Sequence, residues 1–136
     1  MSYMATAALQ EAVFSALMAD ATVDTLSSGA IYDALPPGPV PSLYVSLGAE
    51  RVKDASDKSG RAAVHDFSIT IVTDSAGFYQ AKALAAAISD VLDGADLALA
   101  RGSLTSMNFS RARARRVGEK REIEVWFRAF IDVIGA

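Results

Sequence analysis

A strand followed closely by a helix, in residues 62–100, constrains the fold more than any other part of this sequence. Polar and apolar side chains alternate from Asp66 to Ile71, which is typical of a strand with one buried face. Apolar side chains then recur at steps of three and four residues from Ala81 to Leu92, which predicts an amphipathic helix. Because each element has one apolar face, we expect the two faces to bury each other.

Polar residues and a glycine mark the expected ends of this helix. The run Thr73-Asp74-Ser75 breaks the alternation of the strand and offers side-chain oxygens that can cap a helix N-terminus. Asp93-Gly94 follows the last apolar position, and glycine suits the left-handed conformation that commonly ends a helix. The sequence therefore predicts a helix between these two boundaries.

The first part of the chain predicts two helical segments. Residues 3–19 carry a single apolar stripe, which is typical of a helix packed on a core. Asp20 can then cap a short second helical turn that ends at Ser27-Ser28-Gly29. A brief extended piece is expected at Ile31 and Tyr32.

A connector, a strand and a polar segment come next. All four prolines lie in residues 36–41, which favours a stiff connector over a proline-rich ligand for a partner. Residues 43–47 alternate as a strand does, with Leu43 directed inward. The segment from Gly48 to Arg61 is polar and charged, which is typical of a long mobile loop between two antiparallel strands.

Two strands joined by a tight turn are expected to close the chain. The first covers residues 103–116, and a change in the apolar register predicts a bulge near Thr105-Ser106. The turn lies at residues 117–119, and the last strand covers residues 120–134. In total we expect one domain over residues 1–136 with an α+β fold, in which helices pack on one face of a mostly antiparallel sheet of about four strands.

The residues that usually carry catalysis or hold metals are scarce in this chain. It has no cysteine and a single histidine, His65, which shares the inward side of its strand with Phe67. Disulfides, thiolate metal sites and a histidine dyad are therefore excluded, and we expect His65 to be structural. No phosphate-binding loop or dinucleotide fingerprint occurs. We expect a protein that is not an enzyme and that has no catalytic residue, no metal and no cofactor.

Charge is distributed unevenly along the chain. The first 100 residues hold 12 acids and 5 bases, whereas the last 36 hold 4 acids and 8 bases. This polarity suits a subunit that contacts copies of itself or a charged neighbour, and a solvated basic hairpin explains it equally well. No apolar run reaches the length of a membrane span, and no signal peptide is expected at the N-terminus.

Basic side chains crowd the end of the predicted hairpin. Arginines at two-residue spacing share one face of a strand, where like charges repel unless an acidic surface, a phosphate or solvent relieves them. We expect a contact with another subunit or partner here, and the basic residues assigned to it are Arg111, Arg113, Arg115, Arg116, Lys120 and Arg121.

Two large aromatic side chains lie on the unexpected face of the last strand. Trp126 and Phe130 share the parity of charged residues rather than the parity of the core. We expect either the N-terminal helix or another subunit to cover them, together with Tyr44, and we assign both to the same contact.

The order of these elements and a set of particular residues resemble a known family. The markers in the first part of the chain are Leu17, Asp20, Ala21, Leu26, Ile31, Tyr32 and Pro36. The markers in the second part are His65, Ile69, Gly77, Ala81, Leu92 and Leu97. Over nearly its whole length the chain resembles the tail-completion proteins of long-tailed bacteriophages and of phage-like gene transfer agents.

The resemblance implies a tail terminator, a structural protein of the virion that sits at the head–tail junction and is assembled in the cytoplasm of the host bacterium. Such a protein forms a hexameric ring on the tail tube protein, stops polymerisation of the tube and joins it to the head connector or stopper protein. DNA passes through the ring without being bound specifically, and no membrane partner is implied. The crowded arginines are not part of the resemblance, so whether they face DNA or protein is open.

Two other functions fit the same sequence. A neck or head-completion adaptor of the same particle would join other rings instead of capping the tube. A small nucleic-acid-binding module would use the basic residues from Arg111 to Arg116. A terminator should be hexameric or assemble on tail tubes, whereas a DNA-binding module should bind DNA with steep salt dependence as a monomer or dimer.

Overall fold

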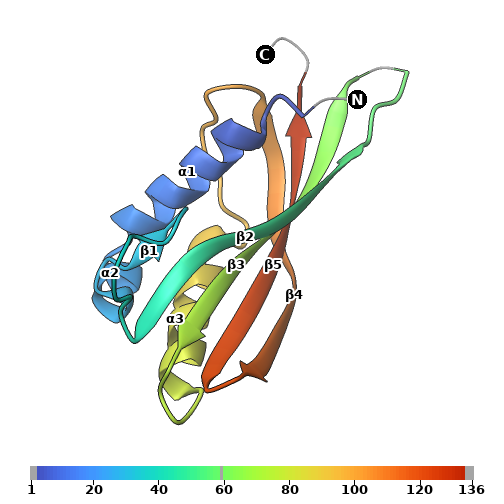
Figure 1. Ribbon diagram of the computed structural model, residues 1–136. Coiled ribbons are helices and arrows are strands. Elements are labelled where there is room, and N and C mark those ends of the chain that lie inside the picture. The colour runs from blue at the N-terminus through green and yellow to red at the C-terminus, as the bar shows by residue number, and fades with distance from the viewer. Residues whose placement is uncertain (1–2, 59, 134–136) are drawn as a thin grey trace.

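The computed structural model of this protein describes residues 3–58 and 60–133 and contains one mixed sheet with three helices (Figure 1). The strand order is β1-β2-β3-β5-β4, and every neighbouring pair is antiparallel except β1 and β2, which are parallel. The strands are β1 (Ile31–Tyr32), β2 (Leu43–Asp54), β3 (Ala62–Thr73), β4 (Ser103–Val117) and β5 (Lys120–Asp132). The helices are α1 (Thr6–Ala19), α2 (Ala21–Ser27) and α3 (Tyr79–Leu92). None of the described helices is long and apolar enough to cross a membrane.

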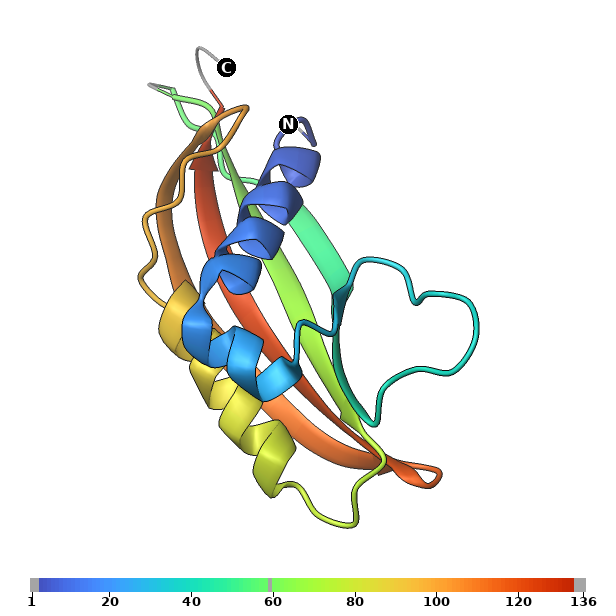
Figure 2. The same ribbon diagram turned by 90° about the vertical axis from the view of Figure 1, so that its left-hand side faces the viewer.

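All three helices lie on the same face of the sheet, as Figure 2 shows. The expected α+β fold with helices on one face is therefore confirmed. The sheet has five strands instead of about four, because the brief extended piece at Ile31 and Tyr32 pairs with Val45 and Ser46 and adds a short parallel strand at the edge.

The core lies between this face of the sheet and the helices. Phe127 of β5 is fully buried at its centre, with the ring of Phe67 stacked at 5.6 Å and the ring of Phe109 edge-on at 6.3 Å. The buried helix residues that close over the sheet are Leu9, Val13, Leu17, Leu84, Ile88 and Leu92. The expected strand and helix of residues 62–100, which are β3 and α3, therefore supply two sides of one continuous core.

Three of the four predicted helix boundaries are confirmed, and one of them is the end of α2 at Ser27-Ser28. The side chain of Asp20 accepts a hydrogen bond of 3.0 Å from the backbone N–H of Val23 and so caps α2. Gly94 has a φ of +73°, in the left-handed region that glycine favours after a helix.

The predicted cap of α3 is wrong. The helix begins at Tyr79, and its N-cap position, Phe78, makes no side-chain capping bond. Thr73 instead stabilises a turn, because its hydroxyl accepts a hydrogen bond of 3.1 Å from the backbone N–H of Ser75. Threonine and serine oxygens favour such turns as much as helix caps, so the sequence signal was ambiguous.

The predicted loop from Gly48 to Arg61 is also wrong over its first half. Strand β2 continues to Asp54 and pairs with β3 as far as Ala63, so only residues 55–61 connect the two strands. The register shifts between Leu47 and Glu50, and this irregularity interrupts the alternation that a sequence search relies on. The charged side chains in the second half of β2 lie near the edge of the sheet, where water can solvate them.

Strand β4 contains two irregularities. The register shifts between Leu104 and Ser106, which confirms the bulge expected near Thr105-Ser106. A second shift, between Phe109 and Arg111, has no counterpart in the sequence analysis. Past the second shift Ala112 and Ala114 lie beside α3. The alternating arginines Arg111, Arg113 and Arg115 contact outward side chains of β5.

Gly48 lies at the irregularity of β2, where the backbone passes very close to β3. The hydroxyl of Ser68 donates a hydrogen bond of 3.1 Å to the carbonyl of Ala49 across this approach. A β-carbon at Gly48 would collide with that hydroxyl and would sit 3.2 Å from the carbonyl oxygen of Ser68. A residue without a side chain is therefore required here.

Replacing Gly48 with alanine should lower the free energy of unfolding by about 1–3 kcal/mol, because the new methyl group displaces Ser68. Adding Ser68→Ala should recover part of this loss, since it removes the colliding hydroxyl. Gly77→Ala is the matched control, because no atom lies within 4 Å of a β-carbon there. Urea unfolding measures all variants, and equal stability of Gly48→Ala and Gly77→Ala would contradict the close approach.

His65 is part of the core, as its position in β3 predicted. It is fully buried, and neither ring nitrogen has a hydrogen-bond partner among the described residues. Burial lowers the pKa of His65, and the negative charge of Glu50 opposes that shift only in part. The folded protein therefore binds a proton at this residue less readily than the unfolded chain does.

This difference makes stability depend on pH. Below about pH 6.5, the unfolded chain takes up a proton that folded His65 resists, so the free energy of unfolding should fall by up to about 1.4 kcal/mol per pH unit. His65→Leu should remove this dependence, and urea unfolding between about pH 7.5 and 5.5 measures the difference between the two proteins. Parallel pH curves for the wild type and the variant would show that the buried histidine does not titrate in this way.

Candidate functional site

The crowded arginines lie on the face of the sheet away from the helices, opposite acidic and aromatic residues of β5. Arg113 pairs across the strands with Glu124 and Arg115 with Glu122. The nitrogen–oxygen distances of these ion pairs are 3.6 Å and 3.7 Å. The guanidinium of Arg111 lies 5.0 Å from the ring centre of Trp126.

These contacts within the chain relieve the repulsion that the sequence suggested. The sequence placed Glu122 and Glu124 on the outward face of the last strand. It did not give the strand register that sets these glutamates opposite the arginines. Arg113 and Arg115 remain 62% and 48% exposed, so each ion pair contributes at most about 1 kcal/mol to folding. Their charged ends can still reach a partner.

The remaining basic residues form the turn of the β4–β5 hairpin, residues 116–121, which we call the hairpin end. Arg121 donates a hydrogen bond of 3.0 Å to the carbonyl of Ser75 and lies 5.4 Å from the ring of Phe78. Lys120 lies 5.9 Å from the ring of Tyr44. Arg116 is exposed, and so is Val117, an apolar side chain that is 41% exposed at the tip. The hairpin end thus carries three basic residues, the acidic residue Glu119 and one exposed apolar side chain.

Trp126 and Phe130 lie on the outward face, as expected, but α1 does not cover them. The helix packs on the opposite face of the sheet (Figure 2), so that alternative is wrong. Trp126 is partly buried beneath Arg111, and Phe130 is 40% exposed. Cover by another subunit stays a prediction.

Tyr44 does not join these two aromatic residues. It is buried in a separate small cluster with Ala30 and Val72, against which Tyr32 and Val40 pack. Val40 lies within the proline-rich segment, so this connector also covers one end of the outward face.

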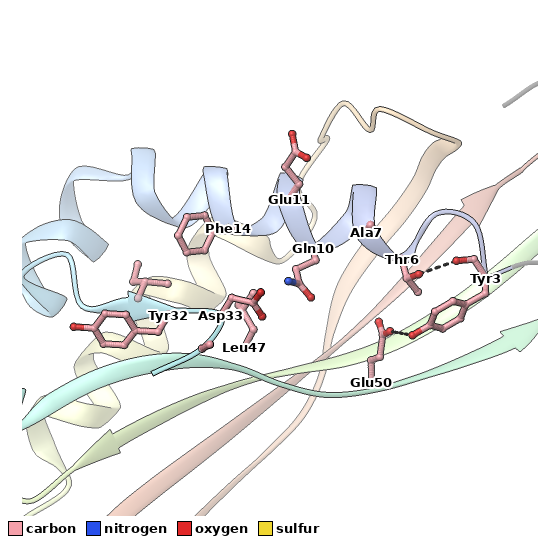
Figure 3. Close-up of a pocket in the computed structure, with 12 residues that line it drawn as sticks. Tyr3, Thr6, Ala7, Gln10, Glu11, Phe14, Tyr32, Asp33, Leu47 and Glu50 are labelled. Atoms are coloured by element: carbon pink, nitrogen blue, oxygen red, sulfur yellow. Dashed lines mark hydrogen bonds between the residues drawn. The ribbon is translucent and has the colours of Figure 1, made fainter. Parts of the chain in front are cut away.

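A groove that the sequence did not reveal runs between α1 and the edge formed by β1 and β2 (Figure 3). Its volume is about 690 Å³, and we call it the α1–β2 groove. Phe14, Ile31 and Leu47 supply apolar surface, while Glu11, Asp33 and Glu50 supply acidic side chains. Among the residues that the structure describes, no lysine or arginine lines it. Only the placement of α1 over the sheet edge brings these residues together, so sequence spacing gave no signal.

One acidic side chain of the groove is fixed in place. The hydroxyl of Tyr3 donates a hydrogen bond of 2.6 Å to a carboxylate oxygen of Glu50, and Thr6 donates one of 2.7 Å to the carbonyl of Tyr3 (Figure 3). The bond to the Glu50 carboxylate raises the pKa of Tyr3, so the phenol stays protonated at neutral pH.

Nothing in the described part of the chain resembles a metal centre. No group of three or more histidine, cysteine, aspartate or glutamate side chains is placed to hold an ion among these residues. Three surfaces suit contacts with other macromolecules. They are the outward side of β4 with Arg111, Arg113 and Arg115, which we call the arginine face, the hairpin end and the α1–β2 groove.

Comparison with known proteins agrees with this picture. A search of curated proteins found no match. A solved structure described as the virion of a native gene transfer agent particle contains a chain that is 55% identical and superposes with a TM-score of 0.92, over 96% of this chain and 99% of that one. The family model of tail completion protein gp17 matches residues 11–132. The chain therefore belongs to the tail completion protein gp17 family.

Proposed function

We propose that this protein is a tail terminator, which forms a hexameric ring on the end of the tail tube and joins the tube to the head connector or stopper protein. The observation that carries the proposal is the match to the tail completion family along residues 11–132. Its similarity to a chain of a gene transfer agent virion supports a place in such a particle.

The distribution of surfaces fits a ring subunit. Such a subunit needs two complementary lateral surfaces and two unlike axial faces. This chain offers a basic hairpin end, an acidic groove and a sheet face that none of its own helices covers. Termination then needs no chemical step, because one axial face binds the last tube ring and the other has the wrong shape to accept a further one.

The arginine face belongs to a contact between protein subunits in this proposal. Several phosphate contacts per subunit around a channel would retard the passage of DNA. Arg113 and Arg115 already lie beside glutamates, which lowers the local positive potential that would attract a phosphate backbone. Trp126 and Phe130 would be covered in the same contact.

Deleting the gene in cells that produce the particle tests the terminator role. We expect tails of uncontrolled length that are not joined to heads, because nothing stops the tube, and electron microscopy of the particles measures both properties. Tails of normal length beside DNA-filled but unjoined heads would instead identify a neck adaptor. If the purified protein binds DNA as a monomer with steep salt dependence and tails are normal, the nucleic-acid-binding module is the correct reading.

The arginine face can be tested with a matched pair of double variants. Arg113→Gln with Arg115→Gln should abolish assembly while lowering the free energy of unfolding by no more than about 1–2 kcal/mol, because exposed ion pairs stabilise little. Glu122→Gln with Glu124→Gln removes the same two ion pairs but leaves the arginines, so its assembly should persist. Ring formation is followed by analytical ultracentrifugation or on tail tubes, and equal loss in both variants would mean that only the internal pairs matter.

A further inference from the structure

We propose that the α1–β2 groove of one copy receives the hairpin end of the next copy. This inference rests on the ring proposed above and names the two surfaces that close it. Glu11, Asp33 and Glu50 line the groove, and none of its described lining residues is a lysine or an arginine. The hairpin end carries Arg116, Lys120 and Arg121.

The two surfaces keep opposite charges after the ion pairs within each chain are counted. Residues 111–124 hold six basic and three acidic side chains, so two internal ion pairs leave the hairpin with a positive excess. Glu11 and Asp33 are exposed at the groove. Opposite charges of this kind steer encounter and fix the register of a contact.

The apolar parts of the two surfaces are complementary as well. Val117 of the hairpin end follows Arg116, pairs with Lys120 across the strands and is 41% exposed. In the groove, Phe14 and Leu47 are partly buried beside Ile31 and offer apolar surface. Burial of one apolar tip inside a polar rim is the usual anatomy of a specific protein contact.

A single chain cannot make this contact with itself. The hairpin end lies at the end of the sheet away from the start of α1 in both views (Figures 1 and 2), and it already touches Tyr44, Ser75 and Phe78. The contact is therefore between copies and uses two different surfaces. A head-to-tail contact of this type repeats, and it closes into a ring when the rotation allows.

Cross-linking with introduced cysteines tests the contact directly, because the native chain has none. Gln10 lines the groove, so the variant Gln10→Cys with Val117→Cys places one thiol on each surface. A flexible bis-maleimide should then produce a ladder of dimers, trimers and larger species. We expect the yield of cross-linked species to be roughly tenfold higher than in the control variant described next, because a docked pair holds its thiols at high effective concentration.

The matched control is Ser15→Cys with Val117→Cys. Ser15 is exposed on the same helix but lines a different hollow, beside residues 97–100, so random collisions alone would link it. Dimers formed by Val117→Cys alone, with no further ladder from the double variant, would indicate a tip-to-tip contact and overturn the proposal.

Charge complementarity has its own measurement in the same background. Adding Glu11→Lys and Asp33→Lys to the cross-linking variant should lower the yield of the ladder several-fold. An unchanged yield would overturn the pairing of this groove with the basic hairpin end.

The contact and the terminator role can fail separately. If rings are seen by electron microscopy but neither they nor purified particles give a ladder above the control, the proposed contact is wrong and the ring stands. If the ladder forms but deletion of the gene leaves normal, joined tails, the contact stands and the terminator role is wrong.

Discussion

The fold depends on burying one face of a long, twisted sheet. Phe127 sits between Phe67 and Phe109 at the centre of that face, and α1 and α3 close over it. Helices cover only this side, so every outward side chain of the three central strands must be satisfied by neighbours, solvent or another molecule. The outward surface of Arg113, Arg115 and Trp126 is available for assembly because helices cover only one face of the sheet.

The irregularities in the strands decide what the open side displays. The second shift in β4 places Arg113 opposite Glu124 and Arg115 opposite Glu122, and it keeps Arg111 over Trp126. One residue more or less would turn the arginines toward the core, because side chains alternate along a strand. Arginines that would repel one another in a row therefore lie beside glutamates, and the positive charge that remains is available to a partner.

Sequence reasoning predicted the helices, the one-sided core and the bulge in β4, because each has a strong local pattern. The hydrophobic alternation around Ile69 and the cap at Asp20 are of this kind. Sequence reasoning failed where the structure depends on contacts between residues that are distant in the sequence. The second half of β2 is charged and irregular, and only pairing with β3 makes it a strand. The acidic groove was invisible for the same reason, since Glu11, Asp33 and Glu50 meet only after α1 crosses the sheet edge.

The shortness of β1 has a consequence for the free subunit. It pairs only with Val45 and Ser46, so in the described part of the chain the backbone of β2 beyond them has no strand on its outer side. A strand edge without a neighbouring strand invites uncontrolled sheet extension. The register shift at Gly48 and the charges of Arg51 and Lys53 discourage it. These features therefore disfavour uncontrolled growth of the sheet through the outer edge of β2 when subunits meet.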